Sequence, residues 1–592
     1  MKTKIPRSTL GAVALCLLAG ICYWILFASC LGRTSGHFTY AMDDPYIHLS
    51  IARDFARNGV WGVTRYANSA ASSSPLWVLL LATAISIGGD RVIWPFVFGI
   101  LFSVISAVFI YYRFIRAGIG IPIAMVAAVA IFAAAPMQIL PFTGMEHSLQ
   151  VFLDLLFVFW LYDKVGRKSD SRDMGSAFLL SALMCLCRFE SVFLVVVPFA
   201  WSLWRRDFRV AIGLALGPIV SIAGFGLLAH AMGMPWIPNS IVLKGNVPHT
   251  FSSWWFLNLY VNLRARSIAL WDLFLLCIAL GVVLRWRGLR KSSSSLQVIL
   301  WTVAVTCVLH SGLAMVGVFY RYEAYMIVLL ATIAVLSLRE ILVYSGPSKE
   351  LPVSELQWFL AIGGVTLAQC LLTSIFWIYQ LSSNLIVSIY AVGLVGLAAL
   401  AVGPPNRGRL TRSFLGTLVP LALYFMLRDR AVQATQAIQD GSQDIYLQQI
   451  QMSRFVDRYY RGGRVVVNDI GAVSYFSDVH LLDLWGLATD SIRDLKLADN
   501  WNTKTMEEQF DAFRPDVIIA YPDWYRKNRK MPPSVVRVAT WTIPKVTSAG
   551  RRIVGFYAPI PKAEHVQTQL KEFERSLPKL VTVSYPGDDI YQ

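Results

Sequence analysis

The sequence predicts a polytopic α-helical membrane protein that ends in a small α/β domain. Of its 592 residues, 56% are apolar and 15% are charged, whereas soluble domains carry about 25% charged residues. Apolar stretches long enough to cross a bilayer recur along most of the chain. The short segments between them gather Lys and Arg, which is typical of the cytoplasmic side of a membrane. These features exclude a disordered chain, a disulfide-stabilised secreted scaffold and an ordinary cytosolic enzyme.

The excess of basic residues does not indicate a nucleic-acid partner. The formal net charge is +17, but Lys and Arg cluster in short loops between apolar runs, and no RNA- or DNA-binding motif is apparent. All eight cysteines lie in or beside apolar segments, and no CxxC pair occurs. We therefore expect neither a disulfide framework nor a cysteine-based metal site.

Apolar runs and basic loops together predict thirteen spans, with the N-terminus in the cytoplasm and the C-terminus outside. The first run is too long for a signal-peptide core, so we expect an uncleaved anchor. Basic residues precede this run and follow the second span, so residues 32–91 form one large outer loop. The run 75–87 is too short to cross and is expected to be re-entrant or juxtamembrane. The expected spans are 10–31, 92–112, 119–138, 148–162, 175–187, 190–204, 210–230, 267–284, 296–317, 323–338, 356–379, 384–403 and 413–427.

Residues 428–592 change in character and are predicted to form an extracytoplasmic α/β domain, which leaves residues 1–427 as the membrane domain. This tail has mixed charge, no Cys and short apolar runs of strand length. The alternation of strand-like and helix-like runs favours an α/β arrangement. Strands are expected at 464–467, 480–484, 516–520 and 552–557, and helices at 506–513 and 563–577.

Two adjacent carboxylates, Asp43 and Asp44, stand at the start of a predicted surface helix in the first outer loop. Asp44 suits an N-cap with Pro45 at the first helical position, and Asn58-Gly59 ends the helix. One interpretation is that both aspartates only cap this helix. A single cap explains one of them, however. Two carboxylates at a hydrophobic boundary also fit a general base, because desolvation raises the pKa of a carboxyl group.

Other outer loops contribute further ionisable side chains. Taken singly, each fits a structural charge, and Arg188 with Glu190 fits an internal pair. Taken together, three cations and three acids gather on one face near the membrane boundary, where ionisable groups are costly and usually mark function. Such cations would bind a phosphate whose lipid tail remains in the bilayer. The cations are Arg188, Lys244 and Arg321, and the acids are Asp43, Asp44 and Glu146.

Several other polar residues have competing interpretations. His48 lies on the apolar face of the predicted helix with no second His nearby, so a packed histidine is favoured over a ligand. In the tail, Asn468-Asp469 and Asp483 could contact a glycan, but aspartates at strand ends usually cap turns, and we favour the cap.

An ordered set of motifs spans residues 40–490: Asp43-Asp-Pro-Tyr-Ile-His48, Ser72-Ser-Ser-Pro-Leu-Trp77, Thr143-Gly-Met-Glu146, Arg188-Phe-Glu190, Pro238-Asn-Ser240 with Lys244, Arg321-Tyr322, Asn468-Asp-Ile-Gly-Ala-Val473 and Leu482-Asp-Leu-Trp-Gly-Leu487. This set resembles the GT-C class of membrane glycosyltransferases. Within that class it most resembles the branch of mycobacterial terminal arabinofuranosyltransferases and bacterial pilin arabinosyltransferases. The sequence departs from the pattern at Phe189, where Pro is expected.

The resemblance implies a GT-C-like fold that transfers a sugar, with arabinofuranose as the best match, from a polyprenyl-phosphate donor. The acceptor would be a hydroxyl of a glycan or a pilin-like protein, outside the bacterial inner membrane, in a cleft that the periplasmic C-terminal domain helps to form. Asp43 or Asp44 would take the acceptor proton. The donor phosphate would be held by Lys244, Arg321 and Arg188. Contacts to the sugar or the acceptor are expected from Glu146, Glu190, His48, Tyr46, Asn239 and Tyr322.

No cofactor is assigned, and three alternatives to this function stay open. Some members of the class use a divalent metal, but the sequence contains no ligand set that requires one. A flippase or transporter of lipid-linked sugars is one alternative, although transporters tend to place ionisable groups at mid-membrane in two similar halves, and no repeat is apparent. A ligase or polymerase of lipid-linked glycans is another. A mannosyltransferase or other hexose transferase of the same class is the third.

Overall fold

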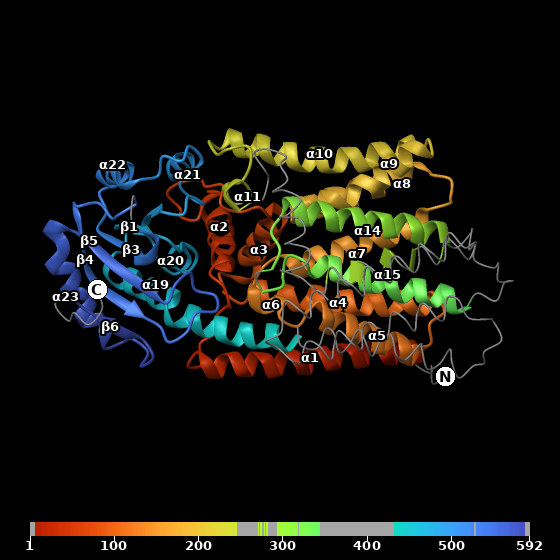
Figure 1. Cartoon of the computed structure of the whole chain (residues 1–592), viewed down its shortest axis with the longest axis horizontal. Coiled ribbons are helices and arrows are strands. Elements are labelled where there is room, and N and C mark those ends of the chain that lie inside the picture. The colour runs from red at the N-terminus through yellow and green to blue at the C-terminus, as the bar shows by residue number, and fades with distance from the viewer. Residues whose placement is uncertain are drawn as a thin grey trace, which may run out of the picture.

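The computed structural model describes residues 6–244, 293–317, 319–343, 431–525 and 529–586, with isolated positions between 270 and 284. The spans expected at 356–379, 384–403 and 413–427, and most of 267–284, lie outside the described residues. A bundle of apolar helices and a sheet domain follow one another along the long axis (Figure 1). The N-terminus lies at the far end of the bundle, and the C-terminus lies at the sheet end.

Within the described residues, the bundle helices follow the predicted spans. Four are long and apolar enough to cross a membrane: α1 (Arg7–Arg33), α4 (Trp94–Arg116), α10 (Phe208–Ala231) and α14 (Ser293–Leu313). The other bundle helices are α5 (Ile121–Ala134), α7 (His147–Lys164), α8 (Ser171–Cys187), α9 (Phe193–Trp204) and α15 (Ala324–Val343).

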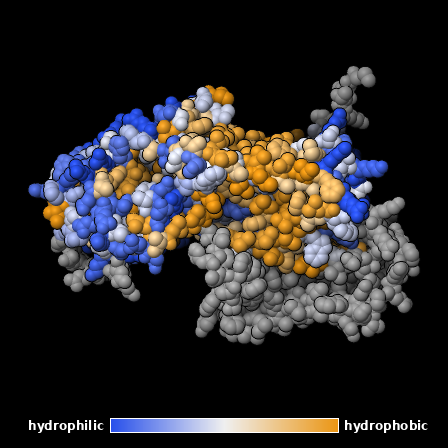
Figure 2. All heavy atoms as spheres, turned by 90° about the horizontal axis from the view of Figure 1, so that it is seen from above, coloured by the Kyte–Doolittle hydropathy of each residue, from blue (hydrophilic) through white to orange (hydrophobic). Residues whose placement is uncertain are grey.

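The surface of the bundle matches a bilayer environment. Figure 2 shows an apolar band over the helices, with hydrophilic residues over the sheet domain and at the opposite end. Large apolar side chains are exposed within this band, such as Leu17, Trp24 and Leu228. Because a soluble monomer rarely exposes so large an apolar surface, the band is the part of the molecule that contacts lipid.

Three short helices lie between the bundle and the sheet domain: α2 (Asp44–Asn58), α3 (Pro75–Gly88) and α11 (Asn239–Lys244) (Figure 1). Helix α2 ends at Gly59 in the left-handed conformation (φ 68°), as the sequence predicted. The short apolar run after it forms α3, which packs against α2 and α8. The juxtamembrane helix predicted there is therefore confirmed as a helix.

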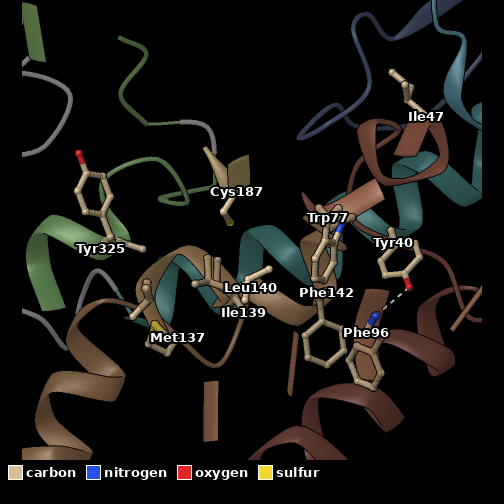
Figure 3. Close-up of a cluster of buried hydrophobic side chains, with 14 of the residues drawn as sticks. Tyr40, Ile47, Trp77, Phe96, Met137, Ile139, Leu140, Phe142, Cys187 and Tyr325 are labelled. Atoms are coloured by element: carbon tan, nitrogen blue, oxygen red, sulfur yellow. Dashed lines mark hydrogen bonds between the residues drawn. The ribbon is translucent and has the colours of Figure 1, made fainter. Parts of the chain in front are cut away.

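A buried aromatic cluster fixes the first outer loop against the bundle (Figure 3). The Tyr40 hydroxyl accepts a hydrogen bond from the Phe96 backbone N–H at 3.1 Å and donates one to the Val92 carbonyl at 2.6 Å. Gly144 has φ 65°, and a Cβ there would lie 2.5 Å from the Pro45 Cβ, so only glycine fits. These contacts hold the start of α2 over the start of α7.

The C-terminal domain contains a six-stranded mixed sheet of order β2-β1-β3-β5-β4-β6. The first three strands in the sequence pair in parallel, and the others pair antiparallel. The four predicted strands are confirmed. The strands are β1 (Arg464–Val467), β2 (His480–Asp483), β3 (Val517–Ala520), β4 (Val535–Thr542), β5 (Ile553–Pro559) and β6 (Thr582–Ser584). The helices are α19 (Gln449–Tyr459), α20 (Gly471–Phe476), α21 (Asp490–Leu497), α22 (Thr503–Phe513) and α23 (Ala563–Glu574).

The strand order creates a topological switch point, the position at which ligands bind in many α/β proteins. Strand β1 lies between β2 and β3, so the chain leaves β1 toward one neighbour and later returns on its other side. The carboxyl ends of β1 and β3 therefore flank a topological switch point. Backbone groups of α20, which follows β1, bond to Asp43 of the first outer loop, so this edge of the sheet faces the membrane domain.

Candidate active site

Asp43 connects the first outer loop to the C-terminal domain. Its carboxylate accepts hydrogen bonds from the backbone N–H groups of Gly471 at 2.6 Å and Ala472 at 2.8 Å, at the start of α20. A Cβ at position 471 would lie 2.1 Å from the Asp43 carbonyl oxygen, so glycine is required there. The Asp43 side chain makes no capping bond to its own helix, α2. Asp44, which the sequence suggested as the N-cap, is instead the first residue of α2, so the interpretation that both aspartates only cap this helix is wrong.

Asp44 lies instead between two cations. The Arg321 guanidinium donates to the Asp44 carboxylate at 2.8 Å, and the Lys244 ammonium lies 3.7 Å from its other oxygen. Arg321 precedes α15 and is 2% exposed, whereas Lys244 ends α11 and is 28% exposed. The structure thus brings together one predicted acid and two predicted phosphate ligands.

Arg188 is held by two carboxylates between α8 and α9. It donates to Glu146 at 2.6 Å and to both oxygens of Glu190 at 2.5 and 3.1 Å. Glu146 is fully buried, and the His48 ring nitrogen lies 3.9 Å from its second oxygen. The internal pair that the sequence suggested for Arg188 and Glu190 is present, with Glu146 as a third member.

Tyr322 joins these two ionic groups. Its ring centroid lies 5.3 Å from the Arg188 guanidinium carbon and 4.8 Å from that of Arg321. The Arg321 guanidinium also donates to the Tyr322 hydroxyl at 3.0 Å. An aromatic ring between two guanidinium groups stabilises both through cation–π attraction.

A cavity of about 310 Å³ lies beside these groups. Its polar wall comes from the loops and short helices between the bundle and the sheet domain, and its apolar wall comes from residues at the start of α9 and the end of α14. Leu487, from the loop after β2, closes it on the side of the C-terminal domain. The polar lining includes Asp44, His48, Arg188, Glu190, Lys244 and Tyr322, and the apolar lining includes Phe189, Phe193, Leu313, Ala314 and Met315.

Some predicted site residues do not line this cavity. The Tyr46 hydroxyl accepts a hydrogen bond from the Tyr40 backbone N–H at 3.2 Å, and the Tyr46 side chain is fully buried. The Asn239 amide donates to the Leu487 carbonyl at 3.0 Å and to Asp490 at 2.8 Å. Both side chains hold the domains and loops together in this structure, and their contacts to a sugar stay a prediction. Asp43 and Glu146 lie beside the cavity lining, next to Asp44 and Met145.

The two neighbouring aspartates differ in basicity. Burial raises the pKa of Asp43, the negative charges of Asp469 and Asp44 raise it further, and the two backbone N–H groups oppose this, which leaves the pKa at about 8. Burial would also raise the pKa of Asp44, but the charges of Lys244 and Arg321 outweigh it and lower that pKa below its usual range. Asp43 is therefore the better proton acceptor near neutral pH.

Asp469, in the loop after β1, is a third carboxylate of this region. Gln449 donates to its Oδ2 atom at 2.7 Å, and the Tyr521 hydroxyl is hydrogen-bonded to the same oxygen. Burial is the main cause that raises its pKa. The turn cap favoured from the sequence is wrong for Asp469, because within the described part of the chain its carboxylate bonds to side chains and not to backbone N–H groups. The signal that could have found it is the switch point beside β1.

The same cap is confirmed for Asp483. Its carboxylate accepts hydrogen bonds from the backbone N–H groups of Trp485 at 2.7 Å and Ala488 at 2.9 Å. These bonds shape the loop that carries Leu487 to the cavity. Among the residues that the structure describes, no group of three or more His, Cys, Asp or Glu side chains could hold a metal ion. No metal ligands are assigned.

Comparisons with known proteins define the class of this fold. A family model described as a domain of unknown function, DUF8728, matches residues 439–557, within the C-terminal domain. No curated protein sequence matches the chain. The crystal structure of ArnT from Cupriavidus metallidurans bound to undecaprenyl phosphate matches with a TM-score of 0.50 and 14% identity, over 92% of this chain and 97% of that one. The apo structure of the same ArnT gives a TM-score of 0.47 and 12% identity, over 93% and 98%. The chain is thus a helical membrane protein with an ArnT-like fold and a C-terminal mixed α/β sheet domain.

Proposed function

We propose that this protein transfers a sugar from a polyprenyl-phosphate donor to an acceptor hydroxyl at the outer face of a bacterial inner membrane. The observation that carries the proposal is the cavity, where Lys244 and the Asp44 carboxylate face an apolar wall formed by the ends of bundle helices. Arg321 is not part of the lining but is held beside it by its ion pair with Asp44. A lipid phosphate matches this cavity, because its charged head group can face the cations and its hydrocarbon tail can face the apolar wall. The fold shared with ArnT, a GT-C glycosyltransferase crystallised with undecaprenyl phosphate, supports this proposal.

Lys244 and Arg321 are the proposed phosphate ligands. Two cations share the single carboxylate of Asp44, so one positive charge is left for an anionic ligand. Arg188 also lines the cavity, but Glu146 and Glu190 already neutralise it. We therefore assign Arg188 to holding the cavity wall and Tyr322 in place. Its contribution to phosphate binding is then weaker than the sequence suggested.

Asp43 is the proposed general base. The acceptor oxygen attacks the anomeric carbon and passes its proton to Asp43, while the bond from that carbon to the phosphate oxygen breaks. Lys244 and Arg321 stabilise the departing phosphate, so no acid is required at its oxygen. Each Asp43 oxygen accepts one backbone hydrogen bond and keeps a second lone pair for the proton. Asp44 positions the two cations.

Arabinofuranose is the proposed sugar, on the strength of the motifs, and a glycan or pilin-like protein is the proposed acceptor. His48, Glu190 and Tyr322 line the cavity and are the proposed sugar contacts, with Glu146 behind them. Residues 1–427 form the proposed catalytic membrane domain, and residues 428–592 form the proposed periplasmic domain. A hexose donor is the alternative within the same chemistry.

Reconstitution of the purified protein with labelled polyprenyl-phosphate sugars tests this function. Transfer of label from the arabinofuranose donor to an envelope glycan fraction is expected, with weak transfer from a mannose donor. Stronger transfer from the mannose donor would show that the proposed sugar is wrong but that the proposed reaction is right. Movement of the lipid across the bilayer without transfer would identify a transporter instead.

The phosphate site has its own test. Lys244→Ala should weaken binding of undecaprenyl phosphate by about tenfold or more, because a hydrogen bond to a charged group contributes about 1.5–3 kcal/mol. Lys545→Ala is the matched control, since Lys545 is an exposed lysine of the C-terminal domain paired with Asp440. Unchanged lipid affinity in a folded Lys244→Ala variant would exclude this ligand.

A further inference from the structure

Two tryptophans stand at the edge of the sheet that faces the membrane domain. Trp485 follows β2 and Trp524 follows β3, and their ring centroids lie 5.1 Å apart with planes tilted by 48°. Both are only partly buried, whereas Trp501 and Trp541 of the same domain are buried in its core. Partly exposed indole pairs at a ligand-binding edge are suited to stacking against a flat ligand face.

This pair is connected to the cavity and to Asp43 through neighbouring residues. Leu487, two residues after Trp485, lines the cavity with Asp44 and Lys244. On the other side, the Tyr521 ring lies 5.0 Å from the Trp524 ring, and its hydroxyl is hydrogen-bonded to Asp469. The loop that carries Asp469 leads directly into α20, whose first two backbone N–H groups donate to the Asp43 carboxylate.

Asp469 is rigidly held with one oxygen to spare. Among the described residues, its hydrogen bonds come from Gln449 and Tyr521, and both involve Oδ2, so Oδ1 accepts none. Tyr521 is itself fixed by the Gly550 backbone N–H, which donates to its hydroxyl at 3.2 Å. A Cβ at position 550 would lie 2.6 Å from the Tyr521 ring, so the close approach requires glycine.

Neighbouring cations fix the orientation of the two indoles. The Lys496 ammonium lies 4.4 Å from the Trp485 ring centroid and donates to the Trp485 carbonyl at 3.0 Å. The Arg551 guanidinium carbon lies 5.9 Å from the Trp524 ring centroid. Because these rings are pre-oriented, a ligand that stacks on them loses little entropy in ordering the protein.

We propose that Asp469 and the Trp485–Trp524 pair form a carbohydrate-binding acceptor subsite. Asp469 Oδ1 accepts a hydrogen bond from a sugar hydroxyl, and the indoles stack on the C–H face of a sugar ring. An ionised carboxylate only accepts hydrogen bonds, so it favours hydroxyl donors and disfavours phosphate or carboxylate ligands. The proposal rests on the proposed function, since an acceptor held here presents its hydroxyl near Asp43.

Calorimetric titration of the full-length protein in detergent tests the subsite with two probes, an arabinofuranose oligosaccharide and a mannose oligosaccharide. At least one is expected to bind, and Trp524→Ala and Asp469→Asn should each weaken it by about tenfold or more. Trp524→Phe keeps a ring and should retain most of the affinity. Matched controls lie at the amino end of β2, away from Trp485. Asp478→Asn removes a partner of Arg65, and Tyr66→Ala, in the loop after α2, removes a ring that stacks on His480; both variants should bind as the wild type does.

Two results would overturn the subsite: neither oligosaccharide binds, or folded Trp524→Ala and Asp469→Asn variants bind as tightly as the wild type. Binding of undecaprenyl phosphate, measured on the same preparations, separates this failure from that of the proposed function. If the lipid binds in a Lys244-dependent way while the oligosaccharides do not, only the subsite is wrong. If the lipid does not bind, the proposed function is wrong.

Discussion

Asp43 and Asp44 adjoin in the chain but lie in opposite electrostatic surroundings. Asp43 points toward the C-terminal domain, where burial and Asp469 disfavour its charge. Asp44 points toward Lys244 and Arg321, which favour its charge. Environments that push the pKa values of two acids apart are a general way to divide roles between them.

This division gives different expectations for two conservative variants. Asp43→Asn should lower transfer by about 10²–10⁴-fold, the contribution of a general base, while lipid binding is kept. Asp44→Asn leaves the base in place and frees both cations, so undecaprenyl phosphate should bind at least as tightly as before. Transfer rates and lipid affinity of the two purified variants provide the measurement. Near-native transfer by a folded Asp43→Asn variant would move the search for the base to Asp469 or Glu190.

The pH profile gives a second expectation at the residue scale. A base with a pKa of about 8 is mostly protonated at pH 7, so kcat/KM should rise through pH 8 and fall about tenfold for each pH unit below it. Asp469→Asn removes a negative charge and should lower the pKa of Asp43, which shifts this limb toward acid. The same raised pKa means that the stability contributed by neutral Asp43 is present at low pH and is lost as pH rises through 8. If the acidic limb of the kcat/KM profile stays at the same pH in the Asp469→Asn variant, the charge of Asp469 does not raise the pKa of Asp43.

At the scale of elements, the junction of α2 with α20 differs from its prediction. Helix α2 was expected to lie on the membrane surface, but its polar side contacts the C-terminal domain. Ser50 and Ser474 share a hydrogen bond at 2.9 Å, and Arg53 donates to the backbone carbonyls of Ser474 and Tyr475. The polar residues of α2 therefore form a contact with the C-terminal domain rather than a solvent-exposed face.

Gly471→Ala tests this junction. The added methyl group would lie 2.1 Å from the Asp43 carbonyl oxygen, so the two elements must separate, at a cost of about 1–3 kcal/mol. We expect a lower melting temperature together with reduced transfer. Gly175→Ala in α8 is the control, because a Cβ there meets nothing within 4 Å. Equal melting of Gly471→Ala and the wild type would show that the junction can open without cost.

The strands that the sequence revealed are those with continuous apolar runs, β1, β2, β3 and β5. Strand β4 was missed because its pattern is interrupted at Arg537, where the pairing shifts register, and β6 has only three residues at the sheet edge. Trp77, in the short run expected to be re-entrant or juxtamembrane, is fully buried, since its helix α3 packs against α2. Edge strands and covered helices depend on tertiary contacts that leave little trace in local hydropathy.

The gathering of the site cations and acids was predictable because their loops share one side of the membrane. The choice of partners was not. Asp44 binds Arg321 across 277 positions, and Asp43 binds Gly471 across 428. No local spacing rule connects residues so far apart, so the division of roles within the acidic pair required the structure.

At the scale of the whole molecule, the orientation in the membrane stays a prediction. The basic loop at Lys168 lies at the N-terminal end of the bundle, and the sheet domain lies at the other end. In intact cells, an outer-face thiol reagent should label a cysteine at the exposed position of Lys504 and leave one at Lys168 unlabelled. The measurement needs a background without the native cysteines. Labelling at Lys168 alone would invert the topology.

The bond between Asp43 and α20 also has a consequence for biosynthesis. Asp43 is made early, and the α20 groups that bury it follow 428 positions later. Until the last domain folds and docks, we expect the Asp43 carboxylate to be less buried and its pKa to lie closer to the ordinary value, which makes it a weaker proton acceptor. Its basicity is then acquired only on completion of the chain. A nascent or truncated protein would carry Arg188, Lys244 and Arg321 and still lack a competent base.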